Sequence, residues 1–121
     1  YQDKRADGID LKSLREMTGG DPGLIRRLLE ELHSSNRLDI DQVRPLWEAG
    51  DWKQLADLAH RMKGAARLVN ANALQELCGQ LEGGCKDGLG SDELRNRALA
   101  VEQAMAALQD DLLAQLRTLA A

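Results

Sequence analysis

The segment 59–66, with the sequence AHRMKGAA, contains a histidine, a lysine and a glycine within about one helical turn. Helical residues three and four apart are surface neighbours, so a helix here places Lys63 and Gly64 beside His60. An imidazole is nucleophilic near neutral pH and can release a group again, and a nearby cation stabilises an arriving negative charge. These residue types would allow His60 to take up and release a negatively charged group, although an exposed lone histidine is most often an ordinary surface residue.

The apolar residues around this histidine form a separate helical stripe. Their spacings alternate between three and four residues, and they are Leu55, Leu58, Met62, Ala65 and Val69. His60 lies off the stripe, so burial of the stripe leaves the imidazole facing water. The second ring nitrogen needs an acceptor that fixes the tautomer, and Glu82 on the following helix is a candidate.

Gly64 is informative because a glycine inside a helix costs about 1 kcal/mol relative to alanine. We interpret it as open space through which the active site of another protein reaches the imidazole; close helix packing is the alternative. Arg61, Arg67 and Lys53 make the region locally basic. A solvated face and a docking role explain these three side chains equally well.

Composition excludes several functions. The 121 residues include 16 basic and 20 acidic side chains, a formal net charge of −4, which argues against a general nucleic-acid binder. No Gly-rich phosphate loop and no acidic pair set for Mg²⁺ is present, so we expect no ATP site and no phosphorylation of the chain by itself from ATP. Cys78 and Cys85 have no CxxC spacing, so we expect reduced thiols, no metal site and no cofactor.

The elements that position this segment are expected to be helices throughout, because no stretch alternates apolar residues at period two. Gly19-Gly20, Gly50-Asp51 and segments 70–72 and 88–91 separate the helical patterns. The short joints favour antiparallel neighbours. The fold class is therefore all-α, an antiparallel four-helix bundle with a short additional N-terminal helix. Residues 1–121 form a single domain, and 1–8 are a linker or disordered start.

Three local features carry sharper expectations. Pro45 removes one backbone hydrogen bond and clashes one turn back, which predicts a kink or a local break in the second helix. Asn72 and Gln75 have the spacing of a capping box. Gly83 and Gly84 predict the frayed end of the fourth helix.

The motif resembles the histidine phosphotransfer (HPt) domain of bacterial phosphorelays. The signature of that family is AHxxKGxxxxxG followed by L and LE, and segment 59–66 matches its start, with Leu74 and Leu81-Glu82 further on. Asn70 stands where the family has a glycine, and we expect a change in turn geometry only, since asparagine tolerates left-handed backbone. The run KGAARLVNA is similar to HPt domains at the C-terminus of hybrid sensor histidine kinases.

The resemblance implies that His60 accepts a phosphoryl group from a receiver-domain aspartate and passes it to a response-regulator receiver. Lys63 would stabilise the phosphoryl charge, and Gly64 would admit the receiver. Mg²⁺ is then expected from the partner receiver. The expected partners are response-regulator receiver domains and, in addition, the receiver and kinase domains of a parent chain, with no nucleic acid and no direct membrane contact. The chain is then expected to be a phosphocarrier without its own ATP site rather than an enzyme.

No apolar run is long enough to span a bilayer, so we expect a cytoplasmic location, such as the cytoplasmic part of an inner-membrane sensor kinase. Two other functions stay open. One is a non-phosphorylated helical docking module for a receiver or kinase. The other is a bundle that binds a metal or haem. The position of His33 and His60 on different helices and faces argues against it.

Overall fold

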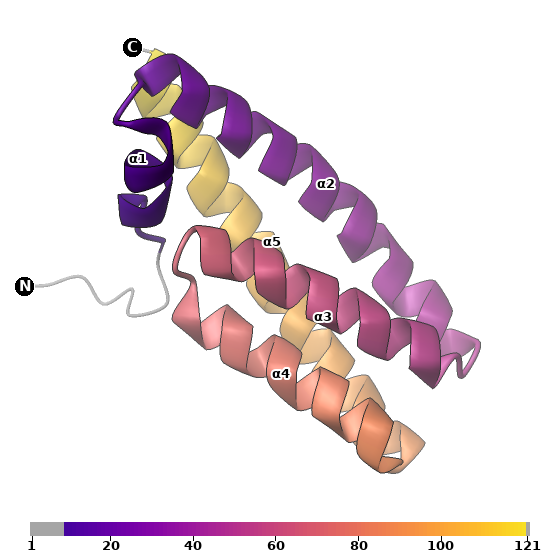
Figure 1. Cartoon of the computed structure of the whole chain (residues 1–121). Helices are drawn as coiled ribbons and strands as arrows, with labels where there is room; N and C mark the ends of the chain where they lie inside the picture. Colours follow the sequence, from indigo (N-terminus) through magenta and orange to yellow (C-terminus); the bar gives the residue numbers. More distant parts are fainter. Residues whose placement is uncertain (1–8, 121) are drawn as a thin grey trace, which may run out of the picture.

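The computed structural model describes residues 9–120, which form five α-helices and no strand. Figure 1 shows the four longer helices side by side as an elongated bundle, with the first helix at one end. The all-α antiparallel bundle with a short leading helix is therefore confirmed, whereas the expected linker 1–8 lies outside the described residues. The helices are α1 Lys12–Thr18, α2 Pro22–Glu48, α3 Trp52–Leu68, α4 Asn72–Asp87 and α5 Ser91–Ala120.

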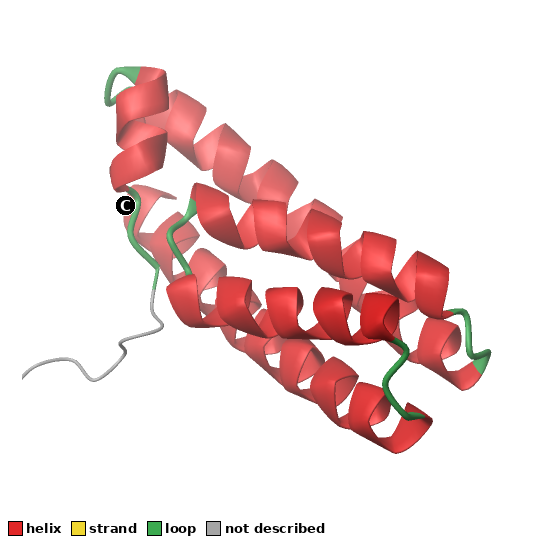
Figure 2. Ribbon diagram, turned by 60° about the horizontal axis from the view of Figure 1, so that its bottom comes forward, coloured by secondary structure: helices red, strands yellow, loops and turns green. Residues whose placement is uncertain are grey.

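Short joints connect the helices, as the green loops in Figure 2 show. The Asp21 carboxylate accepts hydrogen bonds of 2.9 and 3.3 Å from two N–H groups in the first turn of α2. Pro22 opens that helix where a missing N–H does no harm. In the joint between α2 and α3, Gly50 has a φ of 70°, and the Asp51 side chain accepts from the Gln54 N–H at 3.2 Å. Helices joined so tightly must pack as neighbours.

The corner between α3 and α4 keeps its turn without the family's glycine. Asn70 adopts a φ of 56°, in the left-handed region that asparagine tolerates. Its side-chain amide donates to the Asp10 carbonyl at 3.1 Å, which ties the corner to the segment before α1. The predicted capping box is wrong, because Ala71 occupies the cap position. The Asn72 side chain instead accepts from the Gln75 side chain at 3.1 Å.

Of the kink or local break predicted at Pro45, the break is wrong, since α2 continues to Glu48. Pro45 lies in the last turn, and its carbonyl still accepts from the Ala49 N–H at 3.0 Å. A proline this close to the end of a helix removes a single backbone hydrogen bond and leaves little helix beyond it to disrupt. Leu46 and Trp47 consequently still pack against the core.

The two glycines near the end of α4 do not mark its end. The helix passes through Gly83 and Gly84 to Asp87, and Gly88 then ends it with a φ of 72°. A β-carbon on Gly84 would lie 3.1 Å from both Leu89 and Leu94 side-chain atoms. Gly84 therefore permits the close approach of α4 to α5.

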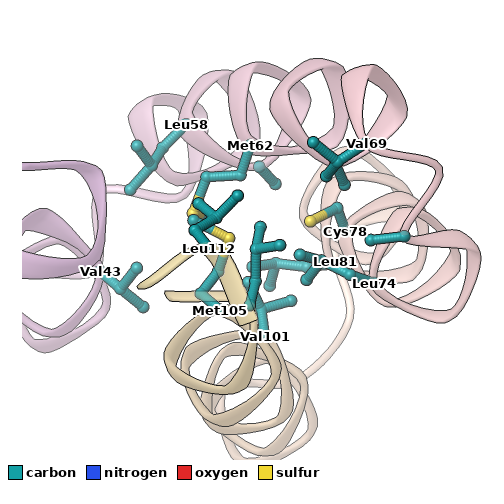
Figure 3. Close-up of a cluster of buried hydrophobic side chains, with 14 of the residues drawn as sticks. Val43, Leu58, Met62, Val69, Leu74, Cys78, Leu81, Val101, Met105 and Leu112 are labelled. Carbon is teal, nitrogen blue, oxygen red and sulfur yellow. The ribbon is translucent and has the colours of Figure 1, made fainter. Parts of the chain in front are cut away.

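The core takes one face from each long helix. In Figure 3, side chains of α3, α4 and α5 point toward a common centre, with Val43 of α2 at one side. The predicted α3 stripe is buried except at Ala65, which is half-buried while Ala66 has no exposed surface. Burial of this face directs the opposite face of α3, which carries His60, toward water.

Asn36 of α2 is a polar residue sealed inside this core. Its side chain has 0% exposure, and neither amide atom has a hydrogen-bond partner among the described residues. A buried polar group without a partner costs about 1–3 kcal/mol. We expect Asn36→Leu to raise the free energy of unfolding by about 1–2 kcal/mol, measured by urea denaturation. Ser34→Leu, at an exposed position of the same helix, is the control, and equal gains in the two variants would contradict the prediction.

Candidate functional site

His60 lies in the middle of α3 on the face away from the core. Its side chain is 70% exposed, whereas Ala59 and Met62 on either side of it have no exposed surface. These two buried neighbours fix the rotation of α3 about its axis. The outward imidazole that the apolar stripe predicts is therefore present.

Glu82 of α4 supplies the acceptor for the imidazole. Its carboxylate oxygens Oε2 and Oε1 lie 3.2 and 3.4 Å from Nδ1 of His60. A carboxylate only accepts hydrogen bonds, so the neutral imidazole carries its proton on Nδ1 and keeps its lone pair on Nε2. Nε2 is therefore the ring nitrogen whose lone pair stays available, a choice that the sequence leaves open.

Lys63 reaches the same carboxylate from one turn further along α3. Its Nζ lies 3.5 Å from Oε1 of Glu82, and its side chain is 29% exposed. One carboxylate of α4 thus holds both the imidazole and the ammonium group of the α3 motif. The role of Lys63 toward a phosphoryl group on His60 stays a prediction.

Lys86 belongs to the same cluster, although the spacing of the α3 motif does not reveal it. Its Nζ lies 3.0 Å from Oε2 of Glu82, and its side chain is 63% exposed. The two residues are four apart on α4, an arrangement known to favour Glu–Lys pairs. That i,i+4 spacing is the signal from which sequence reasoning could have found Lys86.

These contacts lower the pKa of the Glu82 carboxyl below its ordinary value of 4.5. The hydrogen bond from Lys86 contributes most, and the hydrogen bond from His60 adds to it, while burial acts in the opposite direction. A carboxyl with a lowered pKa in the folded state stabilises the fold above its ordinary pKa. That contribution is lost as the pH falls through the lowered value.

We therefore expect Glu82→Gln to be less stable than the wild type at pH 7, by about 1 kcal/mol or less since its lysine partners are partly exposed. The difference should shrink as the pH falls below 4.5 and vanish below the lowered pKa. Thermal unfolding followed across this pH range measures it. Glu30→Gln on α2 controls for the loss of one exposed negative charge, and a difference that grows toward acid would contradict the expectation.

Gly64 borders open space. Apart from its chain neighbours and the backbone of its own helix, no atom lies within 4 Å of the position that a β-carbon would occupy there, and its φ is not positive. Close helix packing, the alternative explanation, is not supported because nothing packs against this residue. An unobstructed surface therefore adjoins His60.

The remaining basic residues divide into two groups. The Arg61 guanidinium donates two hydrogen bonds of 3.2 and 3.1 Å to Asp39, whose side chain is nearly buried, so it braces α3 against α2. Arg67 is exposed near the end of α3. Lys53 lines a shallow groove between α3 and α4 together with Lys86. A docking role for these residues stays a prediction.

The described residues offer no obvious metal centre. Among residues 9–120, no group of three or more His, Cys, Asp or Glu side chains is arranged to hold a metal ion.

Cys78 is buried, which raises the pKa of its thiol to about 12, and burial also raises the pKa of Cys85. No helix within the same residues is both long and apolar enough to cross a membrane.

Comparison with known proteins gives concordant findings. The family model of the Hpt domain matches residues 27–119. The chain is 38% identical over 106 residues to the virulence sensor protein BvgS of Bordetella bronchiseptica, which covers 87% of this chain and 9% of BvgS. For BvgS of Bordetella pertussis the values are 40% over 72 residues, 60% of this chain and 6% of BvgS. The chain thus spans less than a tenth of the length of these curated relatives.

A solved structure shares the fold. The HPT domain from the Hpt sensor hybrid histidine kinase of Shewanella superposes with a TM-score of 0.79 at 16% identity. The match covers 95% of this chain and 98% of that one. At this level of identity the likeness concerns the arrangement of the helices.

Proposed function

Because this chain belongs to the Hpt domain family, whose members are phosphocarrier modules without their own ATP site, we propose that His60 is the phosphoacceptor of its two-component phosphorelay. The function of the chain is histidine phosphotransfer. The observation that carries the assignment to His60 is its exposed imidazole, with Nδ1 against Glu82 and the Lys63 ammonium group on the same carboxylate.

The chemistry follows from the tautomer. The Nε2 lone pair attacks the phosphorus of an aspartyl phosphate on a receiver domain. The N–P bond forms as the P–O bond to the aspartate breaks, and the aspartate leaves as a carboxylate. Nδ1 keeps its proton, so the ring becomes a phosphorylated imidazolium. Attack by the aspartate of a second receiver reverses these steps and restores neutral His60.

The surrounding charges suit this reaction. The Glu82 carboxylate stabilises the positive charge that develops on the ring. The Lys63 ammonium group, on the same carboxylate, can bind the phosphoryl oxygens. Phosphorylation adds about −1.5 to −2 charges if phosphohistidine resembles other phosphorylated side chains. Glu82 is the carboxylate that contacts the imidazole, and we infer that the receiver brings the Mg²⁺ and the acidic groups that bind it.

The similarity to BvgS supports a place in a longer protein. We infer that the parent is a hybrid sensor kinase that carries this domain at its C-terminus, with a cytoplasmic location for the domain. Its partners would then include the receiver of that chain as well as a separate response regulator. Gly64 would lie beneath the docked receiver, where it leaves room for the approach to His60.

The test is transfer of radiolabelled phosphate. A receiver is charged with a labelled small phosphodonor in Mg²⁺, freed of the donor and mixed with the chain. Label that passes to the chain and is lost in acid but retained in alkali supports the phosphocarrier. Binding of the receiver without any transferred label would contradict it and favour a non-phosphorylated docking module.

A further inference from the structure

We propose that Lys86 is a positioning residue for phosphotransfer: it holds the Glu82 carboxylate on Nδ1 of His60 and so leaves Lys63 free to neutralise the phosphoryl group. This inference rests on the proposed function of His60. It assigns a task to a lysine outside the α3 motif.

The two lysines contact different oxygens of the Glu82 carboxylate. Oε2 of Glu82 lies 3.0 Å from Nζ of Lys86 and 3.2 Å from Nδ1 of His60, while Oε1 lies 3.5 Å from Nζ of Lys63. The imidazole hydrogen bond of 3.4 Å goes to Oε1, the oxygen that Lys63 also approaches, so Lys86 holds the carboxylate in place by its other oxygen. The side chain of Glu82 is 12% exposed, so it has little room to move without breaking a contact.

Lys63 alone could not neutralise both the Glu82 carboxylate and a phosphoryl group on His60. It lies three residues from His60 on the same helix, so a phosphoryl group on Nε2 competes with Glu82 for its ammonium group. The phosphoryl group carries more negative charge than a carboxylate and attracts the lysine more strongly. Without a second cation, Glu82 would then face the phosphoryl group uncompensated and would be repelled from the ring.

Lys86 is placed to remove this conflict. It shares α4 with Glu82, four residues away, so its contact does not depend on the position of any α3 side chain. Arg61, the cation next to His60 in the sequence, is bound to Asp39 and is not free to replace it. Lys86 thus keeps the acceptor in place while Lys63 changes partners.

The experiment compares Lys86→Gln, Lys86→Arg and Lys86→Glu in the whole chain. Initial rates of label transfer from a charged receiver are measured, together with the His60 tautomer in the unphosphorylated chain by imidazole ¹⁵N NMR. We expect Lys86→Gln to lower the rate about three- to tenfold and to shift the ring from mainly Nδ1–H toward a mixture of tautomers. Arginine should restore both properties, and glutamate should lower the rate further.

Lys12→Gln, an exposed lysine of α1, is the matched control and should behave as the wild type. Wild-type rate and tautomer in Lys86→Gln would overturn the inference. A slower rate with an unchanged tautomer would also overturn it, because that result indicates a docking role. Failure of the wild type to accept label would instead contradict the proposed function, and the tautomer comparison would still decide the role of Lys86.

Discussion

His60→Gln is expected to abolish acid-labile labelling while leaving the fold intact. Glutamine has no nucleophilic lone pair on nitrogen, so no N–P bond can form. The replaced side chain is 70% exposed and makes its polar contact with Glu82, so little packing is lost. Autoradiography of the transfer reaction measures the loss, and thermal unfolding by circular dichroism should change by no more than a few degrees.

His33→Gln is the matched control, because it removes the other histidine of the chain. His33 lies half-buried on α2, away from the Glu82 cluster on α4, and its replacement should leave transfer unchanged. Acid-labile label that persists in His60→Gln and disappears in His33→Gln would contradict the assignment of the phosphoacceptor.

Gly64→Gln is expected to separate stability from transfer. An exposed glycine inside a helix costs about 0.5–1 kcal/mol relative to good helix formers, and nothing lies within 4 Å of the new β-carbon. The free energy of unfolding should therefore rise by about that amount. The new side chain would occupy the open surface beside His60, and displacing a docked receiver by about 1 Å can lower the transfer rate about 100-fold.

Urea denaturation and initial transfer rates test the two halves of this prediction. Gly83→Gln is the matched control, since Gly83 is also inside a helix with open space at its β-carbon position. It should gain similar stability and keep its transfer rate. Normal transfer by Gly64→Gln would remove the access role of this glycine, and a loss of stability would mean that the open space is needed by the fold itself.

Features that depend on residues close together in the sequence could be predicted from the sequence alone. The three-four rhythm of apolar residues predicts the helices, and Asp21 and Asp51 predict two of their starts, because caps act within one turn. His60 and Lys63 follow from the same rhythm, since the buried stripe decides which face of α3 remains outside. Asn72 and Gln75 show the limit of such reasoning, because a spacing fits several local hydrogen-bond patterns.

The tertiary structure alone decided how α3 and α4 are rotated and staggered against each other. That packing brings Glu82 to an imidazole 22 residues away, leaves the lone pair of Nε2 available and places Lys86 on the same carboxylate. It also pairs Arg61 with Asp39, which lies 22 residues away in the sequence, and buries Gly84 against α5. The sequence determined which residues could do the chemistry, whereas contacts between helices, which depend on the packing of the whole core, decided which of them meet.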